Sequence, residues 1–175
     1  VLHRGEGGRA RALVRRRRDG GGVLLHVREE PRRDAQQLPL RRREPSLSPA
    51  LAAVVACSGQ AQLFTTVANP VVRGPAALTK ILAGLDVISG GRVVAGLGPG
   101  SSERDYASVG IAFDERWPRF EESVKALRAL LRGESFGGHY YEISGPLEPV
   151  PRRSGGPPLW IGSWGSEVGL RRAAR

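Results

Sequence analysis

The chain has 175 residues, of which 40% are hydrophobic and 25% are charged, and its formal net charge is +10. This length is enough for one domain with a hydrophobic core. The one cysteine, Cys57, excludes a disulfide framework and a cysteine metal cluster, and the three histidines show no ligand spacing, so no metal site is expected. The sequence contains neither an apolar run of about 18 residues nor a signal peptide, and we expect a soluble, cytoplasmic protein without a membrane partner.

Arginine is concentrated in the first part of the chain. Residues 1–45 hold 13 arginines and six acidic residues, a net charge of +7, whereas the remaining residues hold 14 basic and 11 acidic residues, a net of +3. Because this part has no sustained helical or strand period, residues 1–47 are predicted to be irregular. Three interpretations stay open: a basic arm that binds nucleic acid, a solvated charged tail, or a stretch foreign to the rest of the chain, as out-of-frame translation would produce. Nucleic acid is the least favoured partner, since the segment has no aromatic residue for base stacking.

Neither end of the chain has the features of a natural terminus. The sequence contains no methionine, and residues 170–175 stop inside a stretch with helical character. We therefore expect the chain to be an incomplete piece of a longer protein.

Regular elements are predicted from Ser48 onward. Residues 49–57 are small and apolar, as in a helix, and residues 62–67 have the composition of a strand that Asn69-Pro70 ends. Pro75 then opens a helix at a favoured position, and its apolar residues recur at helical spacing: Leu78, Ile81, Leu82, Leu85 and Ile88. Gly90-Gly91 ends this helix, and residues 92–97 form a β-branched run typical of a strand buried on both faces. This order of strand, helix and strand predicts a βαβ unit with parallel strands.

A second helix and a further strand follow. Asp114 is a good N-cap, Pro118 falls in the first turn, and the predicted buried stripe consists of Trp117, Phe120, Val124, Leu127 and Leu131. Residues 136–141 (FGGHYY) predict a hairpin around a Gly-Gly turn, and residues 144–158 predict a loop. Residues 159–162 form another short strand, and the chain is helical again from Ser166. The alternation of strands and helices predicts the α/β class.

Three segments occupy the position where parallel α/β folds bind their ligands, beyond the carboxyl ends of the strands. They are residues 65–69 (TTVAN), 96–102 (GLGPGSS) and 162–166 (GSWGS). Glycine lets a backbone approach a ligand closely, while serine side chains and helix N-termini favour phosphate groups. Each segment also has a plain structural interpretation: a tight turn for the glycines, a helix cap for the serines, and side-chain packing for Trp164.

Four segments, in the same order along the chain, resemble the luciferase-like monooxygenase family. Residues 85–101 (LDVISGGRVVAGLGPGS) are similar to a helix, strand and loop of that family, and residues 113–120 (FDERWPRF) to its next helix. Residues 136–141 resemble the family's Phe-x-Gly-x-Tyr-Tyr insertion, and residues 157–166 with 170–175 resemble its fifth strand and the helix after it. The resemblance covers residues 48–175 and is closer to the deazaflavin-using branch than to bacterial luciferase.

The resemblance implies a partial (β/α)8 barrel, since a complete one needs roughly 250 residues. Residues 62–67, 92–97 and 159–162 would be its third, fourth and fifth strands, and FMN or the 8-hydroxy-5-deazaflavin coenzyme would lie in its mouth. The end of the third strand would lie behind the cofactor ring, with a non-proline cis peptide near residues 66–68. The implied cofactor-binding residues are Thr66 and Val67, then Gly98, Gly100 and Ser101 beside the ring, and Gly162, Ser163, Trp164 and Gly165 at the phosphate-bearing tail.

The implied function is a flavin- or deazaflavin-dependent oxidoreductase or monooxygenase acting on a small organic substrate, with a homo-oligomer as one option. The chemistry would be that of the cofactor, either oxygen insertion with reduced FMN or hydride transfer with reduced deazaflavin. No residue is named as a general acid or base, and Tyr106 and Trp117 are expected to pack rather than react. Two alternatives stay open: an inactive fragment of the family and a basic nucleic-acid-binding module.

Overall fold

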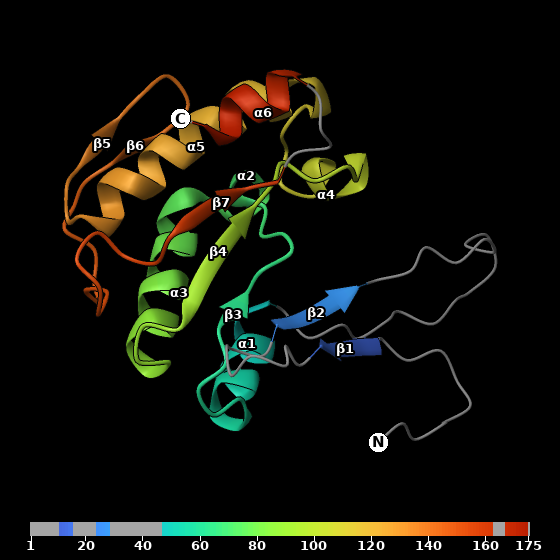
Figure 1. Cartoon of the computed structure of the whole chain (residues 1–175). Helices are drawn as coiled ribbons and strands as arrows, with labels where there is room; N and C mark the ends of the chain where they lie inside the picture. The colour runs from blue at the N-terminus through green and yellow to red at the C-terminus, as the bar shows by residue number, and fades with distance from the viewer. Residues whose placement is uncertain (1–10, 16–23, 29–46, 163–166, 175) are drawn as a thin grey trace.

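The computed structural model of the chain describes residues 11–15, 24–28, 47–162 and 167–174 (Figure 1). Among these residues, three parallel strands form the main sheet in the order β3 (Leu63–Phe64), β4 (Val93–Leu97) and β7 (Leu159–Ile161). Helices separate the strands along the chain, as in βαβ units. The predicted α/β class and the parallel pairing of the strands are therefore confirmed.

The connection from β3 to β4 contains helix α3 (Pro75–Ile88), which begins and ends where the sequence predicted. Pro75 lies in its first turn, and Gly90 and Gly91 follow its end with φ angles of 68° and 88°, which residues with a Cβ rarely adopt. The helical spacing correctly placed Leu78, Leu82 and Leu85 in the core, but Ile88 is exposed. Ile88 is the last residue of the helix, beyond the part of α3 that packs on the sheet.

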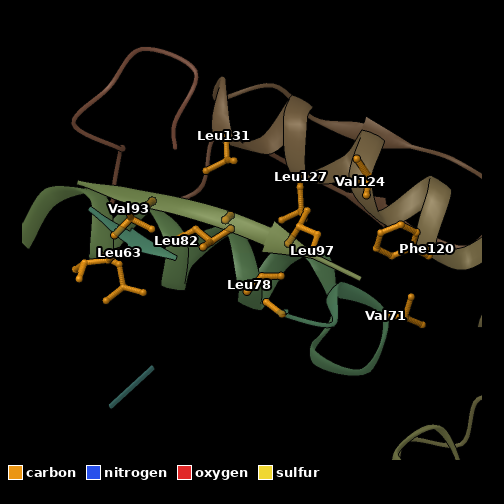
Figure 2. Close-up of a cluster of buried hydrophobic side chains, with 14 of the residues drawn as sticks. Leu63, Val71, Leu78, Leu82, Val93, Leu97, Phe120, Val124, Leu127 and Leu131 are labelled. Carbon is orange, nitrogen blue, oxygen red and sulfur yellow. The ribbon is translucent and has the colours of Figure 1, made fainter. Parts of the chain in front are cut away.

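The hydrophobic core lies between the sheet and two helices, α3 and α5 (Arg116–Leu131). All five residues of β4 are buried, as expected for the middle strand. Figure 2 shows side chains of β4, α3 and α5 gathered in this core, with the labelled Leu97 close to Leu127. Four of the five residues in the buried stripe predicted for α5 are buried: Phe120, Val124, Leu127 and Leu131. The fifth, Trp117, is partly buried.

The region between β4 and α5 differs from the prediction. The chain forms a short helix, α4 (Glu103–Ala107), that was not predicted. Asp114 lies in a 3-10 turn, η1 (Phe113–Glu115), instead of capping α5, which begins at Arg116 with Pro118 in its first turn. Tertiary contacts explain the extra turn, because the Phe113 ring packs edge-on against Tyr106 with 5.5 Å between centroids, and the Arg116 guanidinium lies 4.1 Å from the Phe113 centroid.

β3 is shorter than the strand predicted over residues 62–67. It pairs with β4 at Leu63 and Phe64, and the pairing resumes at Ala68, which bridges to Leu97. The Thr66–Val67 peptide bond between these two stretches is cis, at the position that the family resemblance implied. The chain then enters the short helix α2 (Pro70–Arg73), which Asn69 caps.

The remaining predicted elements are present with small shifts. Helix α1 spans Leu47–Cys57, and helix α6 spans Glu167–Ala173. Strands β5 (Phe136–Gly137) and β6 (Glu142–Ile143) form the predicted hairpin, but its loop covers residues 138–141 instead of a two-glycine turn. Glu122 of α5 stabilises this longer loop, because its Oε1 accepts the backbone N–H groups of Tyr140 at 2.6 Å and Tyr141 at 2.9 Å.

The arginine-rich segment contains two strands that the sequence did not predict. β1 (Arg11–Arg15) pairs antiparallel with β2 (Leu24–Arg28), a pairing that the expectation of irregular structure did not include. The pairing uses backbone groups, which need no periodic side-chain pattern. The pair forms a sheet separate from β3, β4 and β7. The rest of the predicted irregular segment, up to residue 46, lies outside the described residues.

A buried ion pair holds the loop before β7 against α3. The Asp86 side chain is 0% exposed and accepts hydrogen bonds from the Arg153 guanidinium at 2.5 and 2.8 Å and from the Arg153 backbone N–H at 2.9 Å. The guanidinium also donates to the carbonyl of Val93 at the start of β4. The predicted loop over residues 144–158 is therefore anchored to α3 and to β4 shortly before β7 begins.

Candidate functional site

The segments expected to bind a ligand meet at one edge of the sheet wherever they are described. The backbone N–H of Ala68 donates to the Gly96 carbonyl at 2.8 Å, and the N–H of Gly98 donates to the Ala68 carbonyl at 3.1 Å. Gly162, after β7, donates to the Leu97 carbonyl at 2.8 Å. In Figure 1 this edge is marked by the arrowhead of β4, which points toward α2 and α4. The three loops therefore form one surface at the carboxyl ends of the strands.

Val67 lies at the centre of this surface. The residue is 48% exposed, although Thr65 and Ala68 on either side of this stretch are buried. A Cβ added to Gly98 would lie 2.8 Å from Val67 Cγ2, and one added to Gly162 would lie 3.4 Å from Val67 Cγ1. The valine side chain therefore lies directly against the backbone of two glycines. The result is an exposed apolar surface in which no side chain separates Val67 from β4 or β7.

The other predicted site residues fall into two groups. Thr66, Gly100 and Ser101 are exposed on the same edge, and Gly100 has a φ of 73°, which explains the glycine at this turn. Ser102, the neighbour of Ser101, caps α4 by accepting the Asp105 N–H at 3.3 Å. The second group lies outside the described residues: Ser163, Trp164 and Gly165.

Asn69 and Tyr106 hold the loop after β4, a role that the sequence analysis missed. Asn69 Nδ2 and the Tyr106 hydroxyl both donate to the Pro99 carbonyl, at 2.7 and 2.5 Å. Tyr106 is fully buried, and this burial raises the pKa of its hydroxyl, although the Asn69 hydrogen bond and the charge of Arg116 lower it in part. The hydroxyl is therefore protonated and able to donate at neutral pH. The prediction that Tyr106 packs is confirmed, since its ring lies in the core.

Two aromatic side chains lie on the face of the sheet that α3 and α5 do not cover. Phe64 and Trp160 follow the strand alternation away from the core residues Leu63 and Leu159, and their ring centroids are 5.0 Å apart. Trp160 is 58% exposed. It pairs in register with Gly96 of the middle strand. A test of strand alternation on residues 159–162 would have identified Trp160 as facing away from the helices.

A cavity of about 300 Å³ lies in another part of the chain, lined by Arg128, Arg132 and residues 155–159. The lining residues 155–158 precede β7, so this cavity lies at the amino end of that strand. It is therefore separate from the carboxyl-end surface around Val67.

Neither a cluster of metal-ligating side chains nor a membrane-spanning helix occurs in the described part of the chain. There, no three side chains of the His, Cys, Asp or Glu type lie close enough together to hold a metal ion. Of the helices that the structure describes, none combines the length and the apolar character needed to cross a bilayer.

Comparisons with known proteins agree on one family. A family profile described as luciferase-like monooxygenase matches residues 33–175. An F420-dependent glucose-6-phosphate dehydrogenase of Amycolatopsis mediterranei (strain U-32) is 34% identical over 111 residues, covering 57% of this chain and 33% of that protein. A 5,10-methylenetetrahydromethanopterin reductase of Methanolobus tindarius is 30% identical over 109 residues, covering 61% of this chain and 32% of that protein.

A solved structure shows the same arrangement of elements. The monooxygenase RslO1 of Streptomyces bottropensis aligns with a TM-score of 0.67 at 27% sequence identity, covering 73% of this chain and 40% of that chain. The present chain thus spans about a third of the length of the curated relatives that it matches. The part matched by the family profile includes β3, β4 and β7 with the loops that follow them.

Proposed function

Because the chain belongs to the luciferase-like monooxygenase family, we propose that it carries the ring-binding part of a flavin- or deazaflavin-dependent oxidoreductase. The relative from Amycolatopsis mediterranei is named F420-dependent, which favours the deazaflavin F420 over FMN. The substrate is proposed to be a small organic molecule. In this proposal β3, β4 and β7 are the third, fourth and fifth strands of a (β/α)8 barrel in a cytoplasmic protein. Residues 48–175 are proposed as the family domain, inside the stretch of residues 33–175 that the profile matches.

The exposed Val67 side chain between Gly98 and Gly162 is the observation that carries the proposal. A flavin or deazaflavin ring is flat and largely apolar, and it needs a surface from which side chains do not project. Val67 offers an apolar contact, and the absence of a Cβ at Gly98 and Gly162 lets its side chain lie flat against the neighbouring backbone. A Cβ at Gly98 would displace Val67, so the residues present fit a ring stacked at this edge.

The proposed roles of the chain's own residues follow from their positions. Val67 and Thr66 would support the ring from behind, while the exposed backbone of Gly100 and Ser101 would face its polar edge. Gly162, Ser163, Trp164 and Gly165 are proposed to receive the phosphate-bearing tail at the start of α6. When bound, the cofactor supplies the redox chemistry, hydride transfer for F420 or oxygen activation for FMN. The protein orients the cofactor and excludes water from its face.

Replacing Val67 with aspartate is expected to weaken F420 binding at least about tenfold, which corresponds to about 1.4 kcal/mol. The carboxylate would lose water against an apolar ring and would repel the anionic phosphate tail. Binding is measured by fluorescence titration of F420, and folding by circular dichroism.

Val87→Asp is the matched control, because Val87 is 46% exposed and lies near the end of α3, before β4 begins. This control should bind F420 as tightly as the wild-type chain. Equal dissociation constants for both variants and the wild type would show that Val67 does not contact the cofactor.

A further inference from the structure

One side chain, Asn69, connects two loops of the proposed site, the one that follows β3 and the one that follows β4. Asn69 comes directly after Val67 and Ala68, so it belongs to the loop after β3. Its Nδ2 donates to the carbonyl of Pro99 in the loop after β4 at 2.7 Å and lies 3.5 Å from the Tyr106 hydroxyl oxygen. The Tyr106 hydroxyl donates to the same carbonyl at 2.5 Å. The loop after β4 is therefore held at Pro99 by two donors from different parts of the chain.

Hydrogen bonds on both ends of its amide fix the orientation of Asn69. Its Oδ1 accepts the backbone N–H groups of Val71 at 2.9 Å and Val72 at 3.2 Å. A flipped amide would place a donor against these N–H groups and an acceptor against the Pro99 carbonyl. Serine and aspartate can replace the cap on α2, but neither can donate to Pro99 from this position. The asparagine is thus suited to two tasks at once.

The contacts around Pro99 leave the loop little freedom. On one side, the Gly98 N–H is bound to the Ala68 carbonyl at 3.1 Å. On the other side, a Cβ at Gly100 would lie 3.0 Å from Asn69 Nδ2, so the loop approaches the amide closely. Burial keeps the Tyr106 hydroxyl protonated, so its donation to Pro99 persists over the neutral pH range. The exposed residues Gly100 and Ser101 are carried by this fixed segment.

We propose that Asn69 and Tyr106 are positioning residues that hold the loop of residues 98–101 at a set distance from Val67. The cofactor then meets a surface that is already formed, and its binding does not have to order the loop. This inference rests on the proposed function for the ligand, but the hydrogen bonds that carry it belong to the chain itself.

Two variants of the whole chain test the proposal. Asn69→Ser keeps the cap on α2 and loses the donation to Pro99, and Tyr106→Phe loses the hydroxyl but keeps the buried ring. Each is expected to raise the dissociation constant for F420 about tenfold. Ser108→Ala should leave it unchanged, because the Ser108 hydroxyl donates to Asp105 at the other end of α4.

A destabilised control separates positioning from general structural support. Val71→Ala removes buried apolar atoms from α2 without touching Pro99, so it should lower the Tm and leave the dissociation constant for F420 near that of the wild type. Asn69→Ser should weaken F420 binding even if its Tm is higher than the Tm of Val71→Ala. Equal affinities of Asn69→Ser, Tyr106→Phe and wild type would overturn the proposal.

A measurement without cofactor distinguishes failure of this inference from failure of the proposed function. The backbone ¹H–¹⁵N nuclear Overhauser effect of Gly100 and Ser101 should fall in both variants and stay unchanged in Ser108→Ala, because it reports fast backbone motion. If the wild-type chain binds neither F420 nor FMN, the proposed function fails. A lowered nuclear Overhauser effect in both variants would still support the claim that Asn69 and Tyr106 hold the loop of residues 98–101. Unchanged values in both variants would contradict that claim whatever the wild type binds.

Discussion

Gly96→Ala is expected to destabilise the folded chain by about 3 kcal/mol or more, or to prevent folding altogether. Gly96 lies in the middle strand of the sheet, and a Cβ there would be 2.0 Å from the Thr65 carbonyl oxygen. That oxygen is backbone, so it cannot rotate away as a side chain can. Moving it would disturb the hydrogen bonds from Thr65 Oγ1 and from the Ala68 N–H to the Gly96 carbonyl, at 2.6 and 2.8 Å.

Gly137→Ala is the matched control for this prediction. Gly137 lies in the exposed hairpin, and no atom would lie within 4 Å of an added Cβ, so its free energy of unfolding should stay within about 0.5 kcal/mol of the wild type. Urea denaturation followed by circular dichroism gives both values. If Gly96→Ala unfolds at the same urea concentration as Gly137→Ala, β3 and β4 do not approach each other as described.

Arg153→Ala is expected to lower the free energy of unfolding by about 3 kcal/mol. The substitution leaves the carboxylate of Asp86, which is 0% exposed, without its positively charged partner. The Arg153 side chain is 31% exposed in the native chain, so water can enter after truncation, and the effect should lie at the lower end of the range for buried pairs.

The double variant Asp86→Ala/Arg153→Ala identifies the cause of this loss. It removes both charges and should therefore be more stable than Arg153→Ala in urea denaturation. Arg152→Ala serves as the control, because Arg152 is exposed and should change the free energy of unfolding by less than about 0.5 kcal/mol. A loss in Arg152→Ala as large as that in Arg153→Ala would show that the buried ion pair is not the cause.

The parts of the fold that depend on local patterns could be predicted from the sequence. The spacing of Leu78, Leu82 and Leu85 identified α3 because helical periodicity is a property of neighbouring residues. The position of the candidate site followed from one topological rule, since all strands of a parallel sheet end at the same edge. That rule placed Val67 and Gly98 together without any knowledge of their contacts.

The features that were missed depend on contacts between distant residues. Asn69 and Pro99 are 30 positions apart and Asp86 and Arg153 are 67 positions apart, and no periodic pattern marks either pair. Asn69 was interpreted, with Pro70, as the break after a strand, whereas β3 already ends at Phe64 and Asn69 caps α2. Its two hydrogen-bonding tasks depend on the folded loop. Asp114 was interpreted as a helix cap because its residue type suits one, whereas the packing of Phe113 on Tyr106 extends the turn upstream.

The most direct test of the ring-binding surface is an equilibrium titration of F420, and separately of FMN, with the intact chain. Fluorescence reports binding, and circular dichroism confirms that the same sample is folded. The proposed surface predicts saturable binding of one cofactor per chain, tighter for F420 than for FMN, and weakened by Val67→Asp. A folded chain that binds neither cofactor at concentrations up to about 1 mM, the weak end of the usual affinity scale, would contradict the account.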